Sequence, residues 1–171
     1  MKIVAAYVFG ESSLGVEKLD FVSYMQRGPV RELLRMFAKE AASELGRKVY
    51  TYDDRFHFVC MKKELAVVLV TDAEYPTRVS FGLLAKIFER PDDAMLKYVV
   101  DMCQDPRQVD QLFRIRAELD ETLVIAHQNI DKLLARGDDL DVLVSKSKSL
   151  SDSTKVFYKT ARRHNRCCQV Q

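Results

Sequence analysis

The sequence predicts an α+β protein in which a five-stranded antiparallel sheet flanked by helices is followed by an α-helical coiled-coil segment. Strand-like and helix-like runs share residues 1–104, whereas a regular apolar seam begins at Leu112. With 171 residues, of which 47% are hydrophobic, the chain can build one packed domain of about a hundred residues and an appendage. We therefore expect four parts: a domain over 1–104, a short linker over 105–111, a coiled-coil motif over 112–164 and a tail over 165–171.

The domain is predicted to open with two strands and a helix. An apolar run over residues 3–9 and a second run over 16–20 flank a loop that contains Gly and Ser, which is typical of a hairpin. Gly28 and Pro29 mark the start of a helix, and Gly46 ends it. Its buried face is predicted from the helical spacing of Val30, Leu33, Leu34, Phe37, Ala38, Ala41 and Leu45.

Three strands and two helices complete the predicted domain. The strands are expected over 48–52, 56–61 and 65–71, and the short polar turns between them favour an antiparallel meander. A second helix over 77–90 ends at Pro91, and a third, short helix follows over 94–102. The second helix is expected to turn inward the apolar side chains of Val79, Leu83, Leu84, Ile87 and Phe88.

The coiled-coil segment carries one arginine at the centre of its apolar seam. Alternating steps of three and four residues from Arg136 reach mostly apolar positions in both directions, and a seam of this length needs partner helices. A guanidinium inside such a seam requires carbonyl or carboxylate acceptors, so the facing helices are expected to supply them. The seam positions are Leu112, Ile115, Leu119, Thr122, Ala126, Asn129, Leu133, Leu140, Leu143, Ser147, Leu150, Thr154, Phe157 and Ala161.

The segment ELDETLVIAHQNIDKLLARGDDLDVLVSKSKSL (118–150) resembles the SNARE motif of the R-SNARE, or synaptobrevin-like, family. The resemblance implies that Arg136 meets one glutamine from each of three Q-SNARE helices, Qa, Qb and Qc, in a four-helix bundle that pulls two membranes together. It also implies that Asn129 forms a polar layer seven residues earlier. The alternative is a surface helix hairpin with Arg136 in solvent. Length disfavours it, because a helix over 106–164 would run on the order of 85 Å.

The N-terminal domain resembles the longin (profilin-like) fold. One part of the resemblance is TDAEYPTRVSFGLLAKIF (71–88), at the junction of the last strand and the second helix. The other is FVSYMQRGPVRELLRMFAKE (21–40), which approaches the first helix. Together with the SNARE-like motif the resemblance covers nearly the whole chain, although 91–111 is shorter than the usual stretch before that motif. A longin domain is therefore expected in front of the R-SNARE motif.

Composition and cysteine spacing exclude several classes of protein. The net charge is +2 and no basic-aromatic array occurs, so nucleic acid is not expected as a partner. The sequence holds no run of about 20 apolar residues, so a transmembrane helix is not expected. The apolar start of the chain is typical of a strand rather than a signal peptide. Cys60 and Cys103 are isolated, as expected of buried thiols in a reducing cytosol. No metal-ligand spacing joins the cysteines to His57, His127 or His164, so we expect neither metal nor cofactor.

No catalytic site is expected. Tyr75, His57, Asp53 and Asp54 are acid-base residue types, but no phosphate loop, nucleophile elbow or Cys/His signature accompanies them. Tyr75 with Pro76 is typical of a rigid turn before a helix, and His57 of a strand residue. The chain is therefore not predicted to be an enzyme.

The C-terminal end carries a candidate lipidation site. Cys168-Gln169-Val170-Gln171 fit a prenylation box whose terminal Gln favours a farnesyl group on Cys168, and Cys167 is available for a palmitoyl group. One lipid chain binds a membrane marginally and two hold stably, so the pair fits a reversible anchor. The alternative is a basic tail with two free thiols, because Gln169 is not aliphatic. An acid-free stretch that favours anionic headgroups contains Lys155, Lys159, Arg162, Arg163 and Arg166.

Together these features resemble the prenylated longin-type R-SNAREs, lipid-anchored synaptobrevin homologues without a transmembrane helix. The resemblance implies vesicle fusion and movement between the cytosol and the cytoplasmic face of Golgi, ER-derived vesicle and endosomal membranes. It also implies that the longin domain folds back on the SNARE segment and shelters the lipid. Gly137 and Asp138 offer a hinge, because glycine can end one helix and aspartate can cap the next. We expect a broken, wrapped segment in the closed state and one rod in the open state.

Two other functions stay open at this point. A non-fusogenic longin adaptor or tethering subunit would keep the fold and would need no central arginine. A self-acylating protein would load its own cysteine from an acyl donor. Regulation by phosphorylation is a further hypothesis, since it would put negative charge into or beside the seam. The serines concerned recur at every second position and are Ser145, Ser147, Ser149, Ser151 and Ser153.

Overall fold

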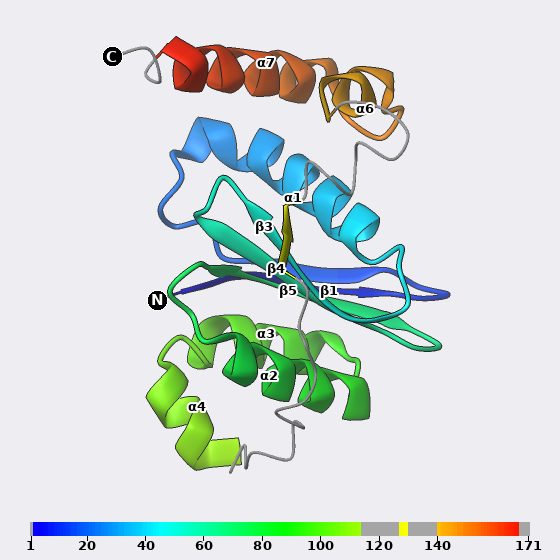
Figure 1. Cartoon of the computed structure of the whole chain (residues 1–171), viewed down its shortest axis with the longest axis vertical. Helices are drawn as coiled ribbons and strands as arrows, with labels where there is room; N and C mark the ends of the chain where they lie inside the picture. The colour runs from blue at the N-terminus through cyan, green and yellow to red at the C-terminus, as the bar shows by residue number, and fades with distance from the viewer. Residues whose placement is uncertain (1, 114–126, 130–139, 168–171) are drawn as a thin grey trace.

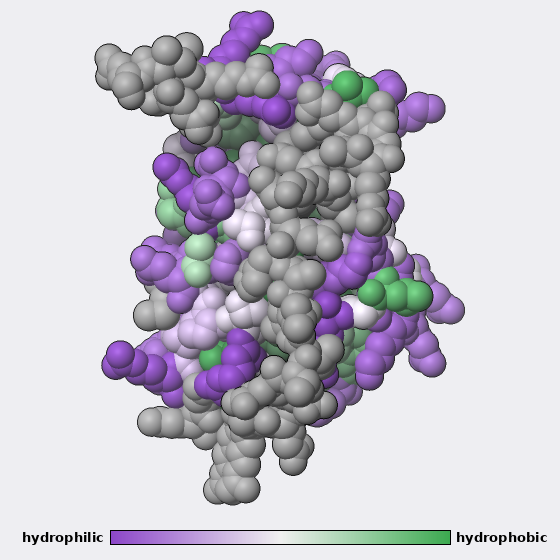
Figure 2. Space-filling view, in the orientation of Figure 1, coloured by the Kyte–Doolittle hydropathy of each residue, from purple (hydrophilic) through white to green (hydrophobic). Residues whose placement is uncertain are grey.

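A central sheet separates two helical layers (Figure 1). The computed structural model describes residues 2–113, 127–129 and 140–167. Its sheet has the strand order β2-β1-β5-β4-β3-β6. Helix α1 lies on one face with α6 and α7 outside it, and α2, α3 and α4 lie on the other face (Figure 1). On the side of the molecule drawn in Figure 2 the described surface is mostly hydrophilic, with apolar residues in small separate patches.

Five strands form the antiparallel sheet that the sequence predicts. They are β1 (Ile3–Phe9), β2 (Leu14–Glu17), β3 (Gly46–Tyr52), β4 (Phe56–Lys62) and β5 (Ala66–Asp72). All pairings among them are antiparallel, and β3, β4 and β5 make the predicted meander. Strand β2 starts earlier and ends earlier than the expected run over 16–20. Strands β1 and β5 are buried over nearly their whole length, since helices cover both faces of the sheet at its centre.

The first helix is shorter than its apolar spacing predicts. A 3-10 turn, η1 (Tyr24–Gln26), leads into α1 (Arg27–Ala41). The prediction that Leu45 lies on the buried face is wrong, because this side chain is 72% exposed. The last helical bonds are donated by the N–H groups of Ala42 and Ser43, and the chain then turns into β3 through Gly46. Gly46 has φ +96°, a conformation that favours glycine and ends the helix before Leu45 can face the core.

The opposite face of the sheet is covered by α2 (Thr77–Glu89), α3 (Asp93–Met102) and α4 (Pro106–Phe113). Asp92 caps α3 by accepting a hydrogen bond of 2.7 Å from the Met95 N–H. The two longer helices agree with the expected ranges to within a residue. Helix α4 occupies most of the range 105–111 that we expected to be a linker, and its Val109 is fully buried beneath the sheet.

Two apolar cores result, one on each face of the sheet. The core on the α1 side includes Tyr7, Phe37 and Phe58, whereas the core on the α2 side includes Phe81 and Leu84. Side chains at positions that alternate along the strands enter opposite cores, as the two-residue period of a strand requires. Each layer is therefore held by its own set of contacts.

A buried carboxylate fastens the first layer to the edge of the sheet. Glu17 at the end of β2 accepts a bond of 2.8 Å from Arg35 Nε and lies 3.2 Å from Arg31 Nε, both on α1. Burial, and then the nearby Glu17 charge, raise the pKa of the Tyr7 hydroxyl far above its ordinary value. The pair of arginines compensates the cost of burying the Glu17 charge.

A sixth strand, β6 (His127–Asn129), comes from the segment that carries the coiled-coil spacing. It pairs with β3 in parallel, with Val49 opposite His127 and Thr51 opposite Asn129. It therefore covers an edge of the sheet that would otherwise offer unpaired backbone groups. Asn129, a predicted seam position, belongs to a strand in this state.

Candidate functional site

The candidate site lies where the C-terminal helices pack on α1. Helix α6 (Leu140–Lys146) and helix α7 (Asp152–Cys167) form the outermost layer of the molecule (Figure 1). Leu150, just before α7, and Tyr158 within it are buried in the core on the α1 side, and Phe157 packs against that core. On α6, Val144 is buried and Leu143 is half-buried in the same core. The layer is therefore joined to the domain by apolar burial and not by hydrogen bonds alone.

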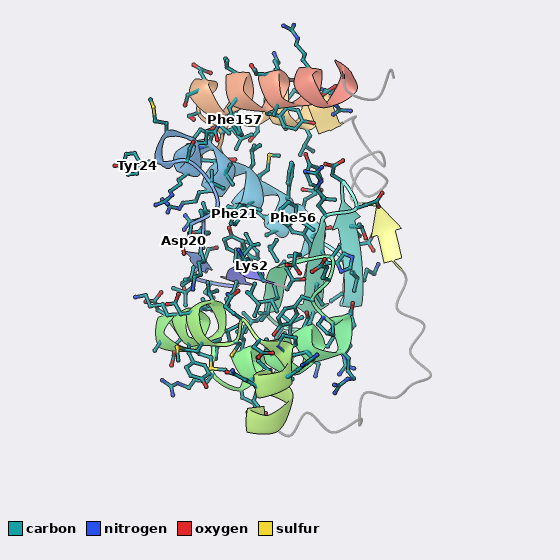
Figure 3. All side chains as sticks on the ribbon, turned by 90° about the vertical axis from the view of Figure 1, so that its left-hand side faces the viewer. Lys2, Asp20, Phe21, Tyr24, Phe56 and Phe157 are labelled. Carbon is teal, nitrogen blue, oxygen red and sulfur yellow. The ribbon has the colours of Figure 1, made fainter. Side chains whose placement is uncertain are left out.

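An apolar cavity lies under α7. Its volume is about 230 Å³, and it is bordered by the chain before α1, by α1 itself, by β1, β3 and β4, and by α7. Phe21, Phe56 and Phe157 lie between α7 and the sheet in Figure 3. All lining side chains are aliphatic or aromatic: Val4, Phe21, Val22, Val30, Leu33, Leu34, Phe37, Tyr52, Phe56, Phe58, Phe157, Tyr158 and Ala161. Such a cavity suits an apolar guest.

A polar junction holds the start of α7. The Glu32 carboxylate of α1 accepts a hydrogen bond of 2.8 Å from the Ser151 N–H and one of 3.0 Å from the Ser151 hydroxyl. The Ser151 hydroxyl also lies 2.9 Å from Thr154 Oγ1, which is fully buried. The bond from the Ser151 N–H is the largest cause that lowers the pKa of Glu32 below its ordinary value. Ser151 is the N-cap of α7, because its Oγ accepts a hydrogen bond of 3.3 Å from the Thr154 N–H, and Glu32 holds this cap residue from another helix.

A second junction joins α6 to α7. Arg162 Nη1 donates to Asp141 Oδ1 at 2.7 Å and to the Tyr158 hydroxyl at 2.6 Å. Its guanidinium carbon also lies 5.9 Å from the centre of the Tyr158 ring. Burial raises the pKa of Tyr158 far above its ordinary value, although the Arg162 charge opposes that shift. The two C-terminal helices therefore dock on α1 as one unit.

Comparison with known proteins agrees with this architecture over nearly the whole chain. Residues 111–171 match the sequence profile of the synaptobrevin family. The chain is 32% identical to "Synaptobrevin homolog YKT6" of Saccharomyces cerevisiae, with 94% of each chain covered. It is 30% identical to the protein of that name from Debaryomyces hansenii, over 96% of this chain and 98% of the relative, and 33% identical to that from Yarrowia lipolytica, over 88% and 86%. The chain belongs to the synaptobrevin family. It is a longin-type R-SNARE of vesicle transport, with a longin domain in front of a SNARE segment.

The structure places the second half of the predicted SNARE seam against the longin domain. Leu143, Ser147, Leu150, Thr154 and Phe157 lie on the α6–α7 layer, where Leu150 and Thr154 are buried. Ala161 borders the apolar cavity, although it is largely exposed. Leu140 begins α6, Leu112 lies in α4 and Asn129 in β6. The remaining positions lie outside the described residues: Ile115, Leu119, Thr122, Ala126 and Leu133.

The central arginine, Arg136, and the hinge residues, Gly137 and Asp138, lie outside the described residues, so their roles stay predictions. The same holds for the prenylation site at Cys168. Cys167 is the last residue of α7. Among the membrane-proximal basic residues, Lys159 and Arg163 are exposed, Lys155 is half-buried and Arg162 is paired with Asp141, whereas Arg166 is described only as part of α7.

Three of the residue types considered for catalysis have structural positions in the described chain: a tie between helices, a turn and a strand. The Tyr75 hydroxyl donates a hydrogen bond of 2.8 Å to the Cys103 carbonyl, which ties the start of α2 to the end of α3. Asp53 and Asp54 form a turn with positive φ, and His57 is a residue of β4, as predicted. Cys60 and Cys103 are buried free thiols, and burial raises the pKa of Cys103 to about 11. Within 2–113, 127–129 and 140–167, no cluster of three His, Cys, Asp or Glu residues could hold a metal ion.

Sequence reasoning missed several residues of the site. Glu32 was not predicted because its partner Ser151 lies 119 residues away in the chain. Phe21, Tyr52 and Phe56 border the cavity without any periodic signal, since they lie on a loop and at strand ends. Val30 and Leu34, by contrast, belong to the apolar face predicted for α1, and both are partly buried against the core. No described helix is both long and apolar enough to cross a bilayer.

Proposed function

We propose that this protein is an R-SNARE that drives vesicle membrane fusion by forming a four-helix bundle with three Q-SNARE helices. The observation that carries the proposal is the packing of Leu150, Thr154 and Phe157 against the longin domain. These are seam positions, which would face the partner helices in a bundle. One side chain cannot be buried in both places, so the closed molecule and the bundle exclude each other. The longin domain thereby acts as a regulator that competes with the Q-SNAREs.

Arg136 would form the central layer of the bundle. Its guanidinium would donate hydrogen bonds to one glutamine of each Q-SNARE helix, named Qa, Qb and Qc, which satisfies a charge that an apolar seam alone would leave unpaired. Opening would occur at Gly137 and Asp138, where two shorter helices could join into one. The cost of Gly137 inside that helix is on the order of 1 kcal/mol, which a long bundle can offset.

Membrane attachment would come from lipids on the C-terminal cysteines. A farnesyl group on Cys168 and a palmitoyl group on Cys167 would together hold the protein on a membrane, whereas the farnesyl group alone would allow release. The cavity under α7 supports a closed state that shelters the farnesyl chain, because its walls are apolar and α7 leads directly to Cys167. No enzymatic activity is needed for this cycle.

The basic residues of α7 would assist attachment. Lys159 and Arg163 are exposed and lie within the last turns before the anchor, where anionic headgroups would attract them. Arg162 would become available once its pairing with Asp141 is broken on opening. The expected sites of action are the cytoplasmic faces of Golgi, ER-derived vesicle and endosomal membranes, with a closed pool in the cytosol.

The test is bundle formation by the full chain with sets of candidate Q-SNARE helices, followed by circular dichroism. Wild type should gain helix cooperatively with a defined set, and Glu32→Ala should do so faster because its α7 is less firmly held. Arg136→Leu should weaken the gain or make it indifferent to the set of partners. Failure of wild type and Glu32→Ala to gain helix with any set would refute the R-SNARE proposal and favour a longin adaptor.

A further inference from the structure

Three large apolar side chains stand exposed on one short turn before α1, which we name the 21–26 turn. Phe21 is 53% exposed, Tyr24 is 86% exposed and Met25 is 88% exposed. Single exposed apolar residues are ordinary on a protein surface, but a group of them within five residues marks a contact surface. Tyr24 projects away from the body of the molecule in Figure 3. We propose that the 21–26 turn is a membrane-contact site that enters the interfacial region of a lipid bilayer.

The 21–26 turn is held in one shape by hydrogen bonds within the described chain. Arg27 Nε donates to the Val22 carbonyl at 3.1 Å, and the Val22 N–H donates to the Leu19 carbonyl at 3.1 Å. The Gln26 N–H donates to the Ser23 carbonyl at 2.9 Å and closes η1. Because the backbone is ordered already, insertion of Tyr24 and Met25 would cost little further conformational entropy.

The position of the 21–26 turn favours a membrane as its binding partner. Helix α7 runs antiparallel to α1, so its C-terminal end lies over the start of α1 (Figure 1). Phe21 borders the same cavity as Ala161 of α7, six residues before Cys167. The turn therefore lies at the end of the molecule where α7 ends. A membrane anchor at the C-terminus would bring the turn to the bilayer.

The chemistry of the surrounding surface also fits lipid headgroups. A tyrosine ring suits the interface because its body is apolar and its hydroxyl is polar. On one side of Phe21 a polar hollow is bordered by Lys2, Lys18 and Asp20, and Lys18 also lies 3.7 Å from the Asp101 carboxylate. On the other side lie the last turns of α7 with their exposed cations. Exposed apolar side chains beside the cations of α7 are the pattern of a peripheral membrane site.

This inference rests on the proposed function only in assuming that the C-terminus is brought to a membrane, and the experiment supplies that step chemically. The chain contains no tryptophan, so Tyr24→Trp makes a single fluorescent reporter in the turn. The full chain is coupled through Cys167 or Cys168 to phosphatidylcholine–phosphatidylserine vesicles that carry a maleimide lipid. Cys60 and Cys103 are buried, which directs the coupling to the terminal pair. The matched control is Met102→Trp, because Met102 is 64% exposed on α3, across the sheet.

The indole of the Tyr24→Trp variant should shift its emission to the blue on coupling and should be quenched by brominated lipids. The indole of the Met102→Trp variant should show neither effect. Equal responses of the two variants, or no response from Tyr24→Trp, would overturn the proposal. Neither result depends on whether the chain is lipidated in cells or binds Q-SNAREs, so the proposed function stands or falls separately.

A binding measurement gives the second arm of the test. Full chains alkylated at the terminal thiols with one prenyl group should partition reversibly onto the same vesicles. The double variant Tyr24→Ser/Met25→Ser should bind about tenfold more weakly than wild type, since two apolar side chains are lost from the interface. Leu45→Ser removes a similarly exposed side chain at the other end of α1 and should bind as wild type does. A double variant that binds as tightly as Leu45→Ser would contradict membrane insertion.

Discussion

Glu32 is the residue of α1 that holds the start of α7 by hydrogen bonds. Its carboxylate satisfies the backbone N–H and the hydroxyl of Ser151 from a different helix. Glu32→Ala should therefore weaken the docking of α7 by on the order of 1 kcal/mol, the usual net value of a hydrogen bond. Hydrogen exchange of residues 151–158 should accelerate severalfold. Glu40→Ala on the same helix is the control and should leave that exchange unchanged.

Acidification should open the molecule through the same carboxylate. The pKa of Glu32 is lowered in the closed state, so ionised Glu32 contributes stability that is fully present above its ordinary pKa. That stability is lost as the pH falls through the lowered value. Hydrogen exchange of α7 in a pH series should show this loss in wild type. In Glu32→Gln the amide does not titrate over this range, so an unchanged acid response in that variant would remove Glu32 as the cause.

Alanine substitution should change stability in opposite directions at Gly15 and at Gly28. A Cβ on Gly15 in β2 would lie 2.5 Å from Cδ1 of the buried Tyr7 ring. Gly15→Ala should lower the free energy of unfolding by about 1–3 kcal/mol, the usual cost of overpacking. A Cβ on Gly28 in α1 would meet no atom within 4 Å, so Gly28→Ala should raise stability by up to about 1 kcal/mol. Thermal melts of both variants check the pair, and equal shifts would contradict the packing around Tyr7.

At the scale of elements, we expect the burial of α7 to stabilise the docking of the C-terminal segment rather than the fold of the domain. Leu150→Ala should cost about 2–3 kcal/mol of docking, since the side chain is buried in the core beneath α7. Protease cleavage within 140–167 should become faster, while the domain core of residues 2–113 stays resistant. Val156→Ala is the control, because Val156 is 64% exposed on the same helix. If cleavage of the domain accelerates equally, α7 is part of the domain's own core.

The elements could be predicted from the sequence where a period and a stop signal agree. Helices α2 and α3 match expectation because Pro76, Pro91 and the apolar spacing mark the same boundaries. Strand β6 could not be predicted, because its three residues carry helical spacing and become a strand only by pairing with β3. The prediction that Leu45 faces the core was likewise wrong, because α1 ends at Ala41, before the apolar spacing ends. A local sequence pattern does not show the tertiary contacts that determine such elements.

The packing of the C-terminal segment on the longin domain could be expected from the resemblance, whereas the walls of the cavity could not. Leu150, Thr154 and Phe157 lie on the domain, and their role as seam positions in a bundle stays a prediction. The cavity and the contact of Glu32 with Ser151 depend on side chains from β1, β3, β4 and α1 that meet only after folding. Their spacing in the chain is irregular, so no window of sequence reveals them.

At the scale of the whole molecule, the docking of α6 and α7 on the domain should determine the radius of gyration. A compact chain of this length has a radius of gyration of about 16 Å. Wild type in solution should lie near that value by small-angle X-ray scattering. Leu150→Asp, which puts a charge into the core beneath α7, should give a clearly larger radius with an unchanged far-ultraviolet strand signal from the sheet. An unchanged radius would contradict the release of α6 and α7 as a unit.

The sheet divides the apolar interior into two separate cores. Those parts of α6 and α7 that the structure describes enter only the core on the α1 side, whereas Phe81, Leu84 and Val109 belong to the other. Departure of α6 and α7 would leave α2, α3 and α4 packed on the five antiparallel strands β1 to β5. We therefore expect the core on the α2 side to stay intact if the tail is released, so that the domain could bind the tail again without refolding.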